Sequence, residues 1–116
     1  MSENSFETEE GALPVVYVLI WRASEDGPDA EEAFQERIPR LMEWLRDLKR
    51  KGSLVACGGG SFENESGGLT LIKARSVEEA QSISDSCPMN EIGLTEILLW
   101  DVFHADIRIN EHWPDS

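Results

Sequence analysis

The chain has 116 residues, of which 41% are hydrophobic and 28% are charged, a balance typical of one globular domain. Its 23 acidic and 10 basic residues give a formal net charge of −13. Because contacts of Lys and Arg with phosphate dominate nucleic-acid affinity, this charge argues against a nucleic-acid partner. The longest apolar run, residues 15–21, is far shorter than the roughly 18 to 20 residues that span a bilayer, so we expect no membrane partner.

The two ends of the chain differ in composition from its middle. Residues 1–12 are rich in Glu, Ser and Asn and predict a flexible acidic tail, followed by one domain over 13–104 and a C-terminal extension over 105–116. The first residues lack the basic and apolar regions of a signal peptide, which predicts a cytoplasmic protein. Cys57 and Cys87 are too far apart for a CxxC or metal-knuckle motif, so we expect two reduced thiols.

In chain order, residues 15–22 predict a strand that is apolar on both faces. Turn and cap residues over 24–32 then introduce a long helix that ends before Gly52. Steps of four and three residues place the following on one face of that helix: Phe34, Ile38, Leu41, Leu45 and Leu48. Pro39 removes a backbone donor inside this helix, which predicts a kink or a break near Arg37.

The second half of the chain predicts a hairpin, a helix and a strand. The sequence predicts two strands, over residues 53–57 and 69–74, joined by a polar connection over 62–68. The three glycines at 58–60 predict a flexible strand end, because the Lys and Ser or Thr of a phosphate-binding loop do not follow them. Ser76 and Glu79 form a capping-box pattern, followed by an apolar stripe of Val77, Ala80 and Ile83. This helix is expected to end before Pro88, and residues 97–103 predict the last strand.

This order of elements, β-α-β-β-α-β, is the split pattern of the ferredoxin-like α+β fold. Two helices cover one face of a four-stranded sheet, yet the strands carry large apolar residues on both faces. We therefore predict a homodimer in which two subunits pack sheet against sheet.

Several stretches resemble the YCII-related family over about residues 15–103. KGSLVACGG (51–59) is similar to the family's G-x-L-L-x-A-G-P strand, and SVEEAQSISDSCPMNEIGLTE (76–96) is similar to its S-x-E-E-A…D-P-F…A-G-L-x-E helix and turn. The residues that match without gaps are Gly52, Gly58, Glu79, Ala80, Pro88, Gly93 and Glu96. The resemblance implies a dimeric α+β barrel with a pocket between the helices and the sheet.

The resemblance also implies a chemistry, which rests on a His in a P-x-H-L stretch of the first helix and on the Asp of a D-P motif. A His oriented by a carboxylate can move protons near neutral pH, as suits the dehydrochlorinase-type lyase activity known for some relatives. Here the His position is Leu41, within residues 39–42, and the Asp position before Pro88 is Cys87. Both partners are replaced, so we do not assign that activity from the resemblance.

Other polar side chains remain candidates. For a binding pocket we single out Arg22, Arg40, Leu41, Trp44 and Cys87. For catalysis the candidates are Cys87, a nucleophile if a cation lowers its pKa, and the pair His104 and Asp106, to which His112 could add a metal ligand. A pocket thiol, a surface histidine and a structural salt bridge of Arg22 are the simpler interpretations, and we expect no cofactor or metal.

Three functions remain open. The first is a dimeric-barrel protein that binds a small, aromatic molecule without catalysis, or an accessory protein of that kind. The second is a cofactor-independent lyase or isomerase that acts on a small aromatic or cyclic substrate through relocated groups such as Cys87, His104, Asp106 or Arg40. The third is an interaction module that works through its acidic surface, which a pocket filled by the protein's own side chains would favour.

Overall fold

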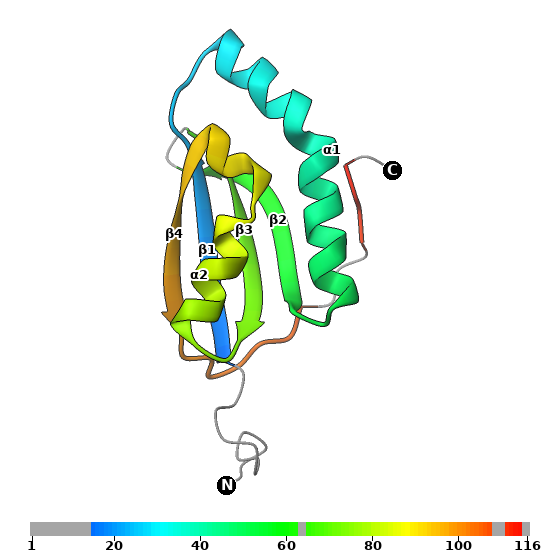
Figure 1. The fold of residues 1–116 in the computed structure, drawn as a ribbon, viewed down its shortest axis with the longest axis vertical. Helices are drawn as coiled ribbons and strands as arrows, with labels where there is room; N and C mark the ends of the chain where they lie inside the picture. The colour runs from blue at the N-terminus through cyan, green and yellow to red at the C-terminus, as the bar shows by residue number, and fades with distance from the viewer. Residues whose placement is uncertain (1–14, 63–64, 108–110, 115–116) are drawn as a thin grey trace, which may run out of the picture.

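The computed structural model describes residues 15–62, 65–107 and 111–114, so the acidic tail predicted over 1–12 lies outside the described residues. The elements are β1 (Val15–Ala23), α1 (Pro28–Arg50), β2 (Leu54–Phe62), β3 (Glu65–Ala74), α2 (Val77–Asp85), the short 3-10 helix η1 (Pro88–Glu91) and β4 (Gly93–Trp100). The strands form one antiparallel sheet in the order β2-β3-β1-β4. Both helices lie on the same face of this sheet (Figure 1). The predicted ferredoxin-like α+β fold is confirmed.

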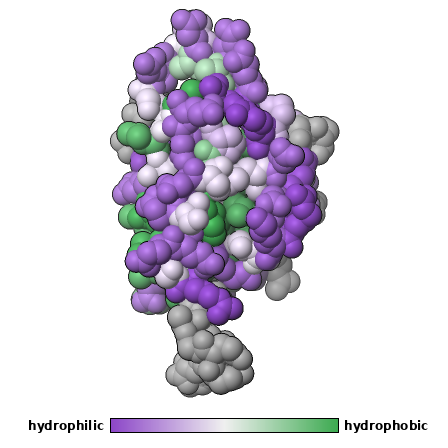
Figure 2. Space-filling model, in the orientation of Figure 1, coloured by the Kyte–Doolittle hydropathy of each residue, from purple (hydrophilic) through white to green (hydrophobic). Residues whose placement is uncertain are grey.

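The two faces of the central strand β1 are both apolar, as predicted. Tyr17, Leu19 and Trp21 are buried beneath the helices, and Ile72, which lies opposite Tyr17 on β3, is completely buried. On the other face of the sheet, which the helices leave uncovered, the apolar side chains include Val16, Val18, Ile20, Leu69, Leu71, Leu94, Leu98 and Trp100. Figure 2 shows that the helix-covered face is mainly hydrophilic, with hydrophobic side chains visible between the helices.

Helix α1 is continuous, so the predicted break near Arg37 is wrong. Pro39 lies inside the helix, where its missing N–H leaves the carbonyl of Gln35 without its usual partner. Both residues are exposed, and water can therefore bond to that carbonyl. The first turns of α1 run obliquely to the later ones in Figure 1, as a proline inside a helix predicts.

The hairpin β2–β3 is longer than the sequence indicated. The stretch 58–60 belongs to β2 and 65–68 to β3, so the polar connection predicted over 62–68 is wrong for most of its length. Gly59 pairs with Gly68 and Gly60 with Gly67. Strand pairing needs only backbone N–H and C=O groups, which glycines supply although their β propensity is low.

Helix α2 begins at the predicted cap. The hydroxyl of Ser76 accepts a hydrogen bond from the Glu79 N–H (3.1 Å), and the Glu79 carboxylate accepts one from the Arg75 N–H (2.6 Å). The predicted apolar stripe is only partly correct, because Val77 is 53% exposed while Ala80 and the polar Ser84 are buried.

Strand β4 starts at Gly93 and ends at Trp100, four residues before the predicted start at 97 and three before the predicted end at 103. It pairs with β1 from Ala23 opposite Gly93 to Val16 opposite Trp100, and β1 sets these limits. The apolar residues beyond Trp100 misled the prediction, since Phe103 is 93% exposed. Within the described part of the chain, no helix combines the length and apolar character needed to cross a membrane.

Gly93 lies directly under the indole of Trp21. A Cβ built at Gly93 would overlap the indole ring and lie 2.5 Å from the Arg22 carbonyl oxygen. The indole is held in place because its Nε1–H donates to the Met89 carbonyl (2.9 Å) and its ring packs on Phe34 with centroids 5.8 Å apart. A side chain at position 93 therefore cannot be accommodated without displacing Trp21.

We predict that Gly93→Ala lowers the free energy of unfolding by about 1 to 3 kcal/mol, because overpacking displaces the indole. Urea unfolding followed by circular dichroism measures this loss. Gly58→Ala is the matched control, since a Cβ there meets no atom within 4 Å. The penalty should shrink in a Trp21→Leu background, and an unchanged penalty in that background would contradict the explanation.

Candidate functional site

A cavity of about 920 Å³ lies between α1 and the sheet, in the size range of small-molecule sites. Its α1 wall is mainly apolar, with Gln35 and Lys49 as its polar members; the apolar side chains are Phe34, Ile38, Leu41, Met42, Trp44 and Leu45. Leu19 and Trp21 of β1 contribute to the sheet side. The space is large enough for a single aromatic ring with its substituents.

The floor of the cavity is formed by strands β2 and β3, and small residues leave much of their backbone accessible. Cys57 and Thr70 are paired across β2 and β3, and the next pair on the same face is Gly59 with Gly68. Gly68 is in turn opposite Trp21 on β1. Two adjacent glycines therefore leave bare backbone beside an indole, a surface on which a flat molecule can lie.

Leu41 and Cys87, the positions where the resemblance implies a His and an Asp, both line this one cavity. Helix α1 supplies Leu41, and the turn between α2 and η1 supplies Cys87. Trp44 also lines the cavity, and its indole N–H donates to the hydroxyl of Ser86 (2.8 Å). The structure thus brings three of the predicted binding residues together.

The thiol of Cys87 is not an activated nucleophile. Burial raises its pKa, and the Met89 backbone N–H that bonds to it offsets this effect only in part. The pKa of Cys57, which also lines the cavity, is raised by burial and then by the charge of Glu111. Both side chains are therefore neutral thiols at neutral pH.

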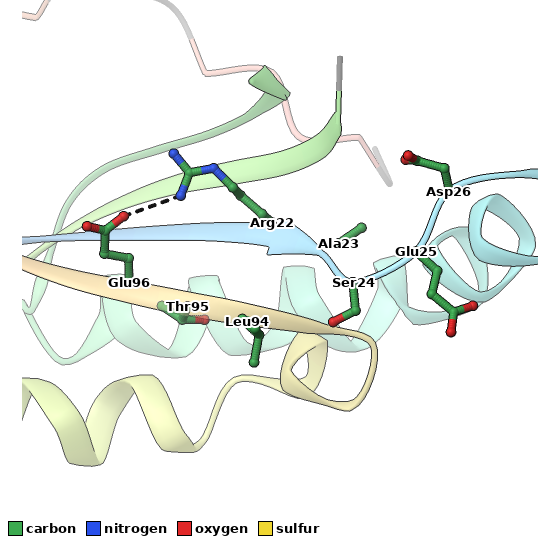
Figure 3. A pocket seen from close by; sticks show the side chains of 8 residues that line it. All are labelled: Arg22, Ala23, Ser24, Glu25, Asp26, Leu94, Thr95 and Glu96. Atoms are coloured by element: carbon green, nitrogen blue, oxygen red, sulfur yellow. Dashed lines mark hydrogen bonds and ion pairs between the residues drawn. The ribbon is translucent and has the colours of Figure 1, made fainter. Parts of the chain in front are cut away.

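The two predicted binding arginines lie elsewhere. Arg22, at the end of β1, pairs with Glu96 (3.3 Å) beside a smaller hollow of about 460 Å³ (Figure 3) and does not line the main cavity. Arg40 is exposed and, together with Arg37, bonds Glu91 of η1 (3.3 and 2.9 Å). These two bonds lower the pKa of the Glu91 carboxyl, with Arg40 the larger cause. Both predicted arginines therefore join elements of the fold.

The candidate pair of a histidine and an aspartate, His104 and Asp106, also lies outside the cavity. His104 and Asp106 are exposed in the segment after β4, and neither lines the cavity. Among the described residues, no group of three or more His, Cys, Asp or Glu side chains could hold a metal ion. His112, the third residue considered as a ligand, does line the cavity.

Sequence reasoning missed the contribution of residues 111–114, which we call the C-terminal strap. The strap lies along α1 on the side away from α2 (Figure 1), and all four of its residues line the cavity. Glu111 accepts a bond from Lys49 (2.5 Å), and the ring of Trp113 lies 4.7 Å from the Arg46 guanidinium. A tryptophan in an otherwise polar chain end was the signal available.

Comparison with known proteins gives a family. A sequence profile of the YCII-related domain matches residues 16–101. A sequence search of curated proteins returns no significant match. Among solved structures, the 5-chloro-2-hydroxyhydroquinone dehydrochlorinase of Burkholderia phenoliruptrix AC1100, in complex with 2,5-dihydroxybenzoquinone, superposes with a TM-score of 0.56 at 18% identity. The superposition covers 73% of this chain and 93% of that one.

The chain belongs to the YCII-related family, since the profile spans most of its length. The structural likeness, at 18% identity, supports the same α+β fold. The family match ends at residue 101, so the strap, His104 and His112 all lie after the matched residues.

We predict that both cysteines react slowly with iodoacetamide near neutral pH, because raised pKa values keep them protonated. Since the thiolate is the reactive form, each rate should rise about tenfold per pH unit and keep rising beyond pH 9. Peptide mapping by mass spectrometry separates Cys57 from Cys87, with an unstructured cysteine peptide as reference. A rate for Cys87 that levels off near pH 7 would show an activated thiolate instead.

Proposed function

We propose that this YCII-related protein binds a small, flat aromatic molecule in the cavity between α1 and the sheet, and that it does so without acid–base catalysis. The observation that carries the proposal is the placement of Leu41 and Cys87 together in one open cavity. Leucine has no proton to transfer, and a protonated thiol is a poor orienting group for a base. The cavity therefore retains room and an apolar lining but lacks the implied pair.

Three physical features support an aromatic ligand. The bare backbone at Gly59 and Gly68 can receive one ring face, and Trp21 and Phe34 offer aromatic walls. Thr70 adds a hydroxyl at the cavity floor that could bond a ring substituent. The dehydrochlorinase with the same fold was solved with a quinone, which makes hydroxylated rings suitable probes.

A cofactor-independent lyase or isomerase is the second candidate, favoured by the activity in the name of the structural neighbour. Elimination of chloride requires a base that removes a proton. Of the relocated groups considered, Cys87 lines the cavity as a thiol, whereas His104, Asp106 and Arg40 do not line it. His112 is the cavity-lining imidazole that this mechanism would need.

The binding proposal predicts that hydroquinone or chlorohydroquinone quenches the fluorescence of the tryptophans that line the cavity, with calorimetry confirming the affinity. Gly59→Val should weaken binding by about tenfold or more, equivalent to about 1.4 kcal/mol, because the new side chain occupies the floor. It should fold normally, since a Cβ at Gly59 meets a single atom at 3.9 Å.

Gly58→Val is the matched control: Gly58 lines the cavity through its backbone alone, and the new side chain would point to the opposite face of β2, so binding should stay unchanged. No binding at millimolar concentrations, or equal binding by both variants, would refute the proposal. Chloride release from 5-chloro-2-hydroxyhydroquinone that His112→Ala or Cys87→Ser abolishes would instead establish the lyase.

We also propose that the uncovered face of the sheet packs against a second copy of the chain. This face carries a partly exposed apolar side chain on each of the strands β1, β3 and β4, among them Val18, Leu69 and the 43% exposed Leu98. A soluble monomer rarely exposes a contiguous apolar surface of this kind. A two-fold pairing of sheets would cover it with an identical surface.

Leu98→Arg should convert the predicted dimer into a monomer, because it places a charge in the interface. Leu99→Arg is the matched control: Leu99 is the next residue, also exposed at 66%, but it points to the helix side of β4. Light scattering and sedimentation velocity measure the mass. Wild-type protein that stays monomeric across a broad concentration range would refute the dimer.

A further inference from the structure

Among the described residues, the charged side chains that line the cavity lie together at one corner, beside the strap and not at the two family positions. Lys49 of α1 bonds Glu111 (2.5 Å), and both side chains line the cavity. Cys57 on the floor interacts electrostatically with both of these charges. His112 follows Glu111 in the chain and completes the corner.

Trp113 attaches this corner to α1. Its ring lies over the Arg46 guanidinium (4.7 Å) and near the Lys49 ammonium (5.9 Å), distances at which cation–π attraction operates. Its indole N–H donates to the second oxygen of Glu111 (3.3 Å). The Glu111 carboxylate is therefore held by two donors, Lys49 and Trp113, which lower its pKa and keep it ionised.

From this geometry we propose that the strap makes the cavity selective for uncharged aromatic molecules over anionic ones, with Glu111 as the residue that sets this selectivity. Lys49 is the one Lys or Arg among the described residues that line the cavity, and Glu111 already neutralises it. An anionic ligand would have to approach a fixed carboxylate without an unpaired lysine to receive it. An uncharged hydroxyl can instead donate to the carboxylate.

The electrostatic effect of these two charges at the cavity floor is net negative, as the proposed selectivity requires. The charge of Glu111 raises the pKa of the Cys57 thiol more than the charge of Lys49 lowers it. A negative charge near Cys57 is therefore disfavoured. The net charge of −13 acts in the same direction at longer range, although salt screens it. The inference rests on the proposed function, since it concerns the ligand of the same cavity.

Two probes that share a dihydroxybenzene ring test it: hydroquinone, which is uncharged at pH 7, and 2,5-dihydroxybenzoate, which carries one negative charge. Calorimetry should show that wild-type protein binds hydroquinone more tightly. Glu111→Gln keeps the size and the acceptor oxygen but releases Lys49, so affinity for the benzoate should rise by about three- to tenfold. Affinity for hydroquinone should not rise, and should fall by only about two- to threefold, because the amide oxygen still accepts a hydrogen bond from the hydroxyl.

Asp47→Asn is the matched control. Asp47 pairs with Arg50 and Lys51 and lies outside the cavity. Its replacement by Asn changes the net charge of the protein by the same amount as Glu111→Gln. It should leave both affinities unchanged, and adding Lys49→Gln to Glu111→Gln should remove the gain for the benzoate.

Wild-type protein that prefers the benzoate, or a gain as large in Asp47→Asn as in Glu111→Gln, would overturn the selectivity while leaving the binding proposal intact. A wild-type protein that binds neither probe would overturn both proposals.

Discussion

The hydrogen bond from the Trp21 indole to the Met89 carbonyl is the constraint on which the cavity depends. It joins the central strand β1 to η1, and η1 follows directly after Cys87. The indole can take this position because Gly93 leaves the space beneath it empty. A buried carbonyl without this donor would cost about 1 to 3 kcal/mol. One bond therefore sets the distance between the sheet and the turn that forms a wall of the cavity.

The order of the elements could be predicted because each has a local cause. Ser76 caps α2, Gly52 follows α1 with a positive φ of 80°, and a continuous apolar run marks β1. The limits of β2, β3 and β4 could not be predicted, because they depend on partners distant in the sequence. Gly59 and Gly68 are strand residues only because they pair with each other, and Gly93 because it pairs with Ala23.

The site could be predicted as far as family positions reach. Leu41 and Cys87 were placed in one pocket by their match to the family pattern, and Trp44 was considered as an aromatic wall; all three line the cavity. Arg22 was chosen as a cation at the end of the first strand and Arg40 as a possible neighbour of Cys87. Each pairs with a carboxylate from another element, Glu96 or Glu91, and for Arg22 this is the salt bridge expected as the simpler interpretation. In a chain with 23 acidic and 10 basic residues, most cations find such a partner. A positively charged side chain alone is therefore weak evidence for a ligand contact in this protein.

This charge imbalance also explains why the strap matters more than its four residues suggest. Glu111 is one of many carboxylates, but Lys49 and the Trp113 indole N–H hold it at the edge of an apolar cavity. There it acts on a ligand at short range, whereas the carboxylates outside the cavity act from greater distances, at which salt screens them more strongly. The family positions Leu41 and Cys87 contribute shape and no charge. The carboxylate at the edge of this cavity therefore comes from a segment that follows the family match.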